Sequence, residues 1–161
     1  MVAWLRAYSL AALMNRGLPM TNACPKHPRP QWMQALPLQF QELLEEVYVL
    51  IEQGPLRFVP GGLRTLVELL GREVLGESLS FGKMPGALHE RHLASAAERD
   101  RLAEVLAGAH AAVHDGTLLS RGAVLHMLLC VERLLQNCFV LSQPHAELRE
   151  VAARREAGRR G

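Results

Sequence analysis

The chain has 161 residues, a formal net charge of +2 at neutral pH and 49% hydrophobic residues, but only 5% aromatic ones. Its length suits one folded domain with a tail or two, and its apolar content excludes a chain that is disordered throughout. Residues 1–35 have a net charge of +4 and residues 149–161 a net charge of +3, which leaves −5 for the residues between them. A dedicated duplex-DNA binder needs a broad basic face, so this distribution argues against that class.

The N-terminal region is predicted to be a helix, at roughly residues 2–16, followed by a proline-rich arm. Arg6 and Arg16 interrupt the apolar run of this helix well short of a membrane span, so we expect no stable membrane insertion. The absence of acids also fits an amphipathic targeting or surface helix, and that alternative stays open. In the arm, Cys24 and His27 stand close together without the second pair that a zinc site needs.

Two amphipathic helices are predicted next, because apolar residues recur at helical spacing. The first begins after Pro37 and ends at Gly54, and the second begins after Pro60. The apolar stripe of the first consists of Phe40, Leu43, Leu44, Val47, Leu50 and Ile51. The stripe of the second consists of Leu63, Leu66, Val67, Leu70 and Val74. Arg64 and Glu68 are four residues apart on the second helix, so we expect them to form an ion pair.

The second half of the chain predicts a short helix at residues 84–92 and two long ones. Ser95 and Glu98 have the spacing of a capping box, which starts a helix that Gly116 ends. The residues expected to face the core on this helix are Leu102, Val105, Leu106, Ala109 and Val113. Ser120 caps the last long helix, "RGAVLHMLLCVERLLQNCFVLS", which is apolar almost all round and is therefore expected to be the most buried.

These elements predict an all-α fold, a helical bundle around a hydrophobic C-terminal helix, since Leu and Ala favour helices over sheet. We assign residues 1–36 to the N-terminal helix and arm, residues 37–153 to the bundle and residues 154–161 to a basic tail. Cys130 and Cys138 lie eight residues apart on one predicted helix, too far apart for a disulfide. Unpaired thiols are typical of a reducing compartment, so we expect a cytoplasmic protein.

His110 and His114 lie four residues apart in the alanine-rich stretch "AGAHAAVHDG", so they share one face of a helix. One interpretation is structural. His114 beside Asp115 stabilises the C-terminus of the helix, and His110 bonds a glutamate on a facing helix, either Glu68 or Glu132.

The same histidine pair also has chemical interpretations. The H-x3-H spacing supplies two zinc ligands, although no Glu follows His110 as in the H-E-x-x-H motif. A third ligand would come from a neighbouring helix, from His126, Asp115 or Glu132. No nucleophile stands in an elbow-like turn, as a catalytic triad would require. We predict neither a metal nor another cofactor.

The order of several short motifs resembles one family. Five motifs follow one another along the chain: a leading Pro, an acidic helix with a Tyr, an R-x-x-x-E helix, a histidine-bearing turn and a final helix with Glu after an apolar residue. The matching positions are Pro37, Glu45, Glu46, Tyr48, Arg64, Glu68, His110, His114, Val131 and Glu132. Over residues 37–153 the chain is similar to a bacterial restriction- and defence-associated domain of unknown function in the HEPN superclan of helical nucleotide-binding domains.

The resemblance implies a homodimer that binds RNA or protein in a bacterial defence, restriction or toxin–antitoxin setting. The wider superclan includes metal-independent ribonucleases, in which His and Arg from two protomers act on the ribose 2′-OH and the phosphate. Here His114 matches that His and His110 the polar position, but Ala109 stands where Arg is expected. We therefore predict a non-catalytic module. Its predicted binding residues are His110, Arg64, Glu68 and Asp115. The alternative is a ribonuclease that uses His114 with a guanidinium recruited from Arg64 or from the partner chain.

Overall fold

The structure is a computed structural model that describes residues 28–159, and the regular structure within that range is entirely helical. The all-α prediction is therefore confirmed. The predicted N-terminal helix, with Cys24 and His27, lies outside the described residues. The α-helices of the bundle are α2 (Leu38–Gln53), α3 (Val59–Leu75), α4 (Met84–Glu90), α5 (Ala96–His114) and α6 (Arg121–Leu135).

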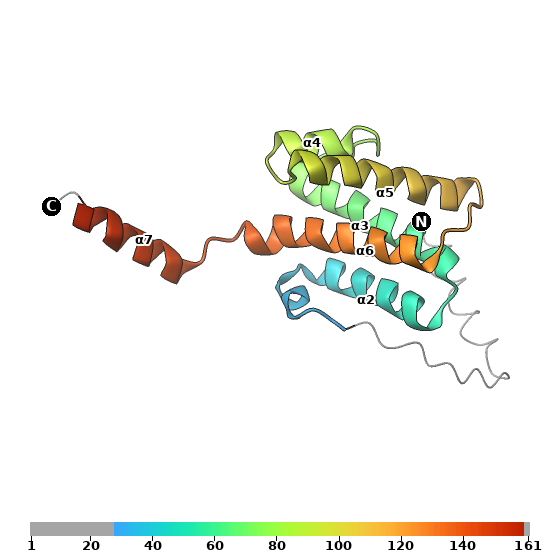
Figure 1. Cartoon of the computed structure of the whole chain (residues 1–161), viewed down its shortest axis with the longest axis horizontal. Coiled ribbons are helices and arrows are strands. Elements are labelled where there is room, and N and C mark those ends of the chain that lie inside the picture. Colours follow the sequence, from blue (N-terminus) through green and yellow to red (C-terminus); the bar gives the residue numbers. More distant parts are fainter. Residues whose placement is uncertain (1–27, 160–161) are drawn as a thin grey trace.

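Three short helical segments accompany these helices. They are the 3₁₀ helices η1 (Gln31–Ala35) and η2 (Leu56–Phe58) and the π-helix η3 (Gln136–Leu141). η3 continues α6 without a break in the chain. The connections are short, so α2 and α5 end where α3 and α6 begin (Figure 1). We call this side of the molecule the hairpin end of the bundle.

The centre of the bundle is α3, which packs against α2, α4, α5 and α6. The last long helix was expected in this position, and that expectation is wrong. α6 buries one side, with Leu128 and Val131, but leaves Leu129 on another side 58% exposed. The apolar content of a helix indicates how much of its surface favours burial. The neighbouring helices decide which side of that helix is covered.

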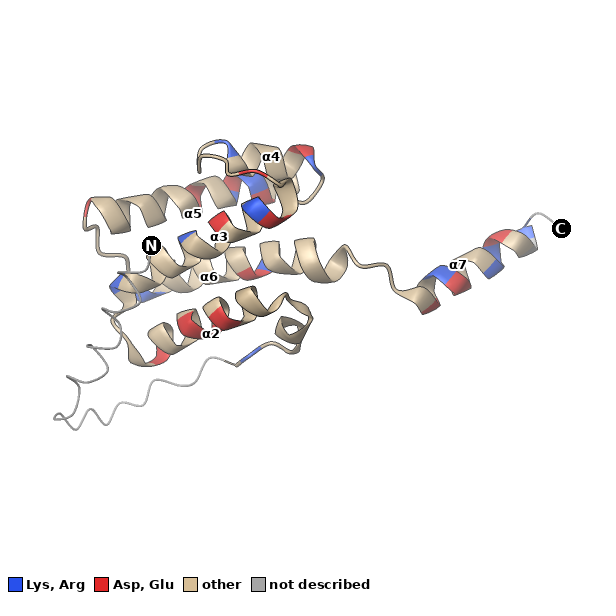
Figure 2. Cartoon of the chain, turned by 180° about the vertical axis from the view of Figure 1, so that it is seen from behind, with Lys and Arg blue, Asp and Glu red and all other residues tan. Residues whose placement is uncertain are grey.

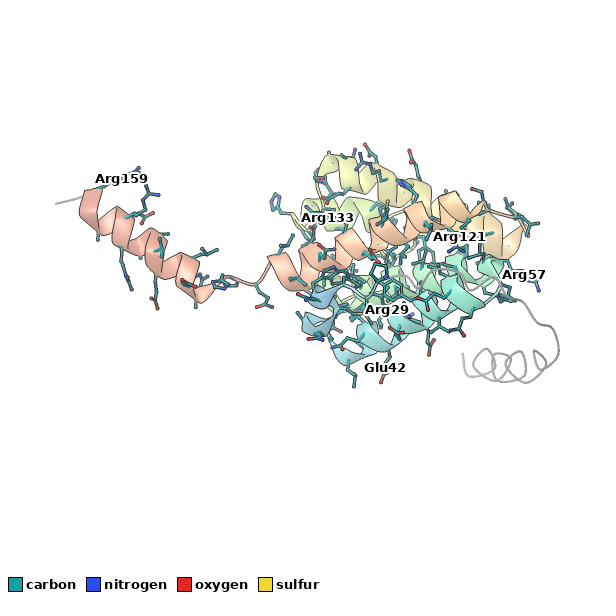
Figure 3. All side chains as sticks on the ribbon, turned by 60° about the horizontal axis from the view of Figure 1, so that its bottom comes forward. Arg29, Glu42, Arg57, Arg121, Arg133 and Arg159 are labelled. Carbon is teal, nitrogen blue, oxygen red and sulfur yellow. The ribbon has the colours of Figure 1, made fainter. Side chains whose placement is uncertain are left out.

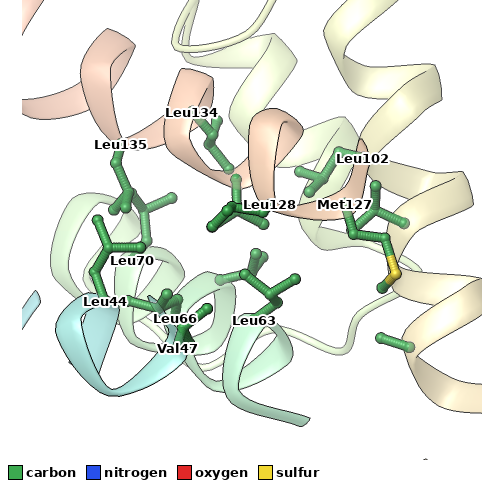
Figure 4. Close-up of a cluster of buried hydrophobic side chains, with 14 of the residues drawn as sticks. Leu44, Val47, Leu63, Leu66, Leu70, Leu102, Met127, Leu128, Leu134 and Leu135 are labelled. Atoms are coloured by element: carbon green, nitrogen blue, oxygen red, sulfur yellow. The ribbon is translucent and has the colours of Figure 1, made fainter. Parts of the chain in front are cut away.

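Leucines from four helices, α2, α3, α5 and α6, fill the middle of the core (Figure 4). The fully buried ones include Leu44, Leu63, Leu66, Leu70, Leu128 and Leu135. Each buried leucine contributes on the order of 1.5–3 kcal/mol relative to an exposed one. α3 packs closely on α4 at Gly71, where an added Cβ would lie 2.7 Å from Cε of Met84 and the end of that flexible side chain would have to shift. Eight of the eleven residues in the predicted stripes of α2 and α3 are buried in this core.

Both predicted helix caps are present. Ser95 Oγ accepts from the Glu98 N–H while the Ser95 N–H donates to the Glu98 carboxylate, which completes the capping box. Ser120 Oγ accepts from the Ala123 N–H at the start of α6. At the end of α2, Gly54 has an extended backbone with φ −102° rather than a left-handed one.

The chain leaves the bundle after η3. α7 (Ala146–Arg159) stands apart from the other helices (Figure 1), and every side chain described from Leu141 onward is exposed. The packed part of the described chain therefore ends near residue 141, and the domain boundary at residue 153 stays a prediction. Pro144 lies in the connection between η3 and α7, where it prevents a continuous helix.

Within the described range, one continuous helical stretch, Arg121–Leu141, has the length and mean hydropathy (1.5) of a helix that crosses a membrane. Of its most apolar window, 44% is buried inside the bundle. The core helix of a globular protein has the same length and composition. The stretch is therefore only weak support for a membrane span.

Candidate functional site

Arg64 and His114 form a hydrogen bond between α3 and α5 at the surface of the bundle. Arg64 lies in the second turn of α3, and His114 is the last residue of α5. Because α5 ends where α3 begins, the side chains meet, and Arg64 Nη1 lies 2.8 Å from His114 Nε2. A guanidinium only donates, so His114 accepts at Nε2 and is neutral in this arrangement, with its proton on Nδ1.

Phe81 and His110 extend this pair into a row of four side chains. Cζ of Arg64 lies 4.1 Å from the centroid of the Phe81 ring, a cation–π contact. The rings of His110 and His114 lie 4.4 Å apart between centroids. Both histidines are exposed, whereas Arg64 and Phe81 are half-buried. We call Phe81, Arg64, His114 and His110 the Arg–His cluster.

The expected ion pair between Arg64 and Glu68 is not formed. Glu68 accepts instead from Arg72, one turn further along α3. Arg64 makes no ion pair with any carboxylate in the part of the chain that the structure describes. Glu68 has an arginine four residues away on each side, and the contacts with Phe81 and His114 draw Arg64 off. The guanidinium charge of Arg64 is therefore not neutralised by a neighbour.

His110 does not bond a glutamate, in contrast to the structural interpretation. Glu132 is buried on α6, and Glu68 is engaged by Arg72. His110 points to solvent next to His114 instead. Helical spacing placed the two histidines on one face correctly, but it did not show which helix that face meets.

The end of α5 differs in two details from the prediction. Asp115 is the C-cap residue, is exposed, and contributes its backbone N–H to the Ala111 carbonyl, so its side chain is not part of the cluster. Gly116 follows with φ 68°, the left-handed conformation expected at a helix end. Val113 was expected in the core but is 40% exposed, because Gly61 opposite it on α3 has no side chain to cover it.

The surroundings of the Arg–His cluster are free of acidic residues on α5. Residues 105–114 contain no Lys, Arg, Asp or Glu, and Figure 2 shows the charged residues of α5 gathered toward α4. Arg57 on η2 and Arg121 at the start of α6 lie at the hairpin end too, away from α7 (Figure 3). An anion that approaches this end therefore meets guanidinium and imidazole groups, with Asp115 as an exposed acidic residue next to His114.

A second arginine–aromatic pair lies between the arm and α2, and in this pair the guanidinium also has carboxylate partners. Tyr48 Oη donates to Glu132 Oε1 over 2.5 Å, and Arg29 Cζ lies 4.7 Å from the Tyr48 ring centroid. The Arg29 guanidinium also pairs with Glu45 and Glu52. Burial raises the pKa of Tyr48 above its ordinary value of 10, and the hydrogen bond to Glu132 adds to this. We call Arg29, Glu45, Glu52, Tyr48 and Glu132 the buried network.

Sequence reasoning missed two members of these groups. Arg29 lies in the region predicted to be a linker-like arm, yet it docks on α2. Phe81 lies in a glycine-containing connection whose residues show no periodicity. The sequence offers one weak hint for each residue: Phe is a scarce residue type in this chain, and Arg29 has no acidic residue near it in the arm. Neither hint identifies the partner in a contact.

No group of three His, Cys, Asp or Glu side chains within residues 28–159 is placed to hold a metal ion. His126 lies on the exposed side of α6, with Nε2 3.8 Å from Cys130 Sγ, and Glu132 belongs to the buried network. Cys130 and Cys138 are free thiols, as expected. Burial raises the pKa of both and brings that of Cys138 to about 11, so these thiols stay protonated at neutral pH.

Comparison of the chain with protein-family models, with curated proteins and with solved structures finds no match. The resemblance to a HEPN-type domain therefore stays a prediction. The function has to be argued from the charges and contacts of the Arg–His cluster.

Proposed function

We propose that this chain is a non-catalytic helical module that binds single-stranded RNA through the Arg–His cluster, in a bacterial defence, restriction or toxin–antitoxin setting. The observation that carries the proposal is that Arg64 is held in place at the surface and makes no ion pair with a carboxylate among the described residues. Arg64 is held by an aromatic ring and a neutral imidazole, and its charge is left for an anion.

The geometry of Arg64 suits a phosphate. A guanidinium has five N–H donors, and the contact with His114 uses one nitrogen, Nη1. The Phe81 ring covers one face of the guanidinium and fixes its plane, so a phosphate can approach from the edge in a bidentate manner. His110 and His114 add N–H donors at the same exposed position.

A single strand fits better than a duplex. The body of the chain is acidic, and Arg57, Arg64 and Arg121 lie at the hairpin end without forming a broad basic face. Single strands bind where a few basic groups track the backbone and planar side chains stack on bases. The exposed rings of His110 and His114 supply such planes.

The proposal includes a homodimer. Leu129 on α6 and Leu141 at the end of η3 are 58% and 60% exposed, although they belong to the most apolar stretch of the chain. Exposed apolar side chains gathered on one side favour coverage by a partner.

A metal-independent ribonuclease is the second candidate, because Arg64 supplies beside His114 the guanidinium that Ala109 does not. In that reaction His114 Nε2 would remove the proton of the ribose 2′-OH, and the 2′-oxygen would attack phosphorus while the 5′-oxygen leaves. The products are a 2′,3′-cyclic phosphate and a 5′-hydroxyl. Arg64 occupies Nε2 here, so it would first have to turn from His114 to the phosphate, which favours the non-catalytic alternative.

Fluorescence anisotropy with a labelled single-stranded RNA, in EDTA and low salt, tests the proposal. We expect Arg64→Ala to weaken binding about tenfold, or about 1.4 kcal/mol, and to lower the salt slope by about 0.7, the value for one lost phosphate contact on a single strand. Arg72→Ala is the matched control, because Arg72 lies on the same helix and is paired with Glu68. Equal effects of both variants, or no binding by the unaltered chain, would refute an Arg–His site for RNA.

The same RNA, analysed on a denaturing gel, separates the two candidates. Intact RNA after prolonged incubation supports the binding module. Cleavage to 2′,3′-cyclic phosphate ends that His114→Ala abolishes would establish the ribonuclease.

A further inference from the structure

α7 is an isolated helix with an apolar edge. It has 14 residues, and its described side chains are exposed without exception. A helix of this length is only marginally stable in water unless it packs against something. Leu148 and Val151 are three residues apart and 67% and 48% exposed, so they form one edge, which Ala152 and Arg155 continue.

A groove that runs between α5 and α6, and continues between η3 and the connection of α4 to α5, lies uncovered beside the start of α7. It consists of two hollows, of about 190 and 270 Å³, which share Glu98. Leu129, Cys130 and Arg133 line the first, and Leu141 and Ser142 line the second. The groove therefore follows α6 and η3 from Leu129 to the residue where the connection to α7 begins. We call it the α5–α6 groove.

The length of α7 matches this groove. Fourteen helical residues span about 21 Å, and the twelve steps from Leu129 to Leu141 span about 18 Å at the α-helical rise. The connection to α7, residues 142–145, begins inside the groove, because Ser142 lines it. A helix laid antiparallel to α6 would bring Leu148 and Val151 over the apolar floor.

Charges along the groove fit the same placement. Arg133 lines the groove and Arg101 lies beside it on α5. Glu156 lies about 15 Å along α7 from its first residue, and Arg133 lies about 12 Å along the groove from Leu141. With α7 antiparallel to α6, these two side chains therefore lie at nearly the same level. Arg155, on the apolar edge, can reach Glu98, the carboxylate shared by both hollows.

We propose that α7 of one copy docks in the α5–α6 groove of a second copy, and that the exchange is reciprocal. α7 continues away from the bundle past η3 in Figure 1, where its own groove is out of reach without a full reversal at Pro144. Exchange of an identical element between two copies closes both grooves with the contacts that one copy would make alone. The inference rests on the homodimer included in the proposed function, and not on RNA binding.

The mass of the full chain in solution tests the exchange. Light scattering after size-exclusion chromatography at micromolar concentration should give a dimer for the unaltered chain and for Ala153→Glu, which adds a carboxylate to the outer side of α7. Val151→Glu adds the same carboxylate to the apolar edge and should give a monomer. A monomeric unaltered chain, or a dimer that Val151→Glu leaves intact, would overturn the proposal.

A cysteine crosslink tests the occupant of the groove. Arg155→Cys, in a Cys24→Ser background, should form a disulfide with the native Cys130 on mild oxidation, and the product should run as a dimer. Glu150→Cys, on the opposite side of α7, is the control and should not crosslink to Cys130. A disulfide between the introduced thiol and Cys130 of the same chain would overturn the second copy as occupant. The absence of any disulfide to Cys130 would overturn the groove.

The outcomes for this inference and for the proposed function are separable. Arg64→Ala should change RNA affinity and leave the mass unaltered, whereas Val151→Glu should change the mass. A dimer that binds no RNA refutes only the proposed function, and a monomer that binds RNA through Arg64 refutes only the exchange of α7.

Discussion

Three arginines among the described residues lie on aromatic rings, Arg29, Arg57 and Arg64, and the surroundings of Arg29 and Arg64 differ in one respect. Arg29 lies 4.7 Å from the Tyr48 ring centroid and Arg64 lies 4.1 Å from that of Phe81. Arg29 has two carboxylate partners, Glu45 and Glu52, whereas Arg64 has the imidazole of His114. Both arginines therefore contact an aromatic ring, but Arg29 also contacts carboxylates whereas Arg64 contacts an imidazole.

The difference separates a structural arginine, Arg29, from Arg64, the arginine that we propose contacts RNA. Hydrogen bonds from Arg29 to Glu45 and Glu52 raise the pKa of Arg29 and satisfy its donors, so the buried network is closed to an added anion. A neutral imidazole accepts one hydrogen bond but cancels no charge. The Arg–His cluster thus keeps a positive charge at the surface and adds little stabilisation to the fold.

The largest effect is expected in the buried network. Tyr48→Phe removes a hydroxyl that donates to the buried Glu132 carboxylate, so the free energy of unfolding should fall by about 2 kcal/mol. Urea denaturation followed by circular dichroism measures this. Thr65→Val is the control, because it removes an exposed hydroxyl that bonds the Gly61 carbonyl, and it should cost less than about 0.5 kcal/mol.

The pH dependence of the same variant checks the cause. The pKa of Tyr48 is raised in the folded chain, so the hydroxyl ionises more readily in the unfolded chain above its ordinary value of 10. The contribution of Tyr48 to the free energy of unfolding is fully present below pH 10 and is lost as the pH rises above 10. Tyr48→Phe should flatten that alkaline loss. An unchanged alkaline slope would show that Tyr48 is not the group responsible.

The next largest effect is expected at His114, next to Arg64. His114→Glu gives Arg64 the kind of partner that Arg29 has, so RNA affinity should fall about tenfold or more, or about 1.4 kcal/mol. The free energy of unfolding should change by less than about 1 kcal/mol, because the new ion pair is exposed. Anisotropy and urea denaturation give the two values. Undiminished RNA binding would mean that the charge of Arg64 is not what RNA meets.

A smaller effect is expected at the opposite end of α5. The backbone N–H of Ser95 lowers the pKa of Glu98 to about 2, and hydrogen bonds from Asn137, Ser95 and Arg133 also lower it. This stabilisation is present above the ordinary value of 4.5 and is lost as the pH falls toward 2. Glu98→Gln should therefore cost about 1 kcal/mol at pH 7 and progressively less below pH 4.5.

The control for this variant is Glu104→Gln, an exposed position on the same helix, which should cost little at either pH. RNA affinity should be unaltered in both variants. A loss of RNA binding in Glu98→Gln alone would mean that the Arg–His cluster depends on the whole of α5 and is not a local site.

The smallest effect concerns the ion pair that does form on α3. Glu68→Ala removes the contact with Arg72 and should cost about 0.3–0.5 kcal/mol at low salt, and less at high salt. Arg64→Ala should not share this salt dependence of stability, because Arg64 has no carboxylate partner among the described residues. A double-mutant cycle between positions 64 and 68 should give a coupling energy near zero.

The helices and their starts were predictable because their signals are local. The capping box at Ser95 and Glu98 and the cap at Ser120 act over three residues, and the stripes of α2 and α3 repeat every three or four. The all-α class and the shared face of His110 and His114 follow from the same short spacings.

The pairing of side chains was not predictable in this way. Arg64 has Glu68 four residues away but bonds His114, 50 residues further along the chain, and Tyr48 bonds Glu132 across 84 residues. Such contacts depend on which helices lie side by side and how each is turned about its axis. Periodicity shows that a helix has an apolar side, but it does not name the neighbour. Packing around α3 made Arg64 a partner of imidazole and left Arg29 among carboxylates.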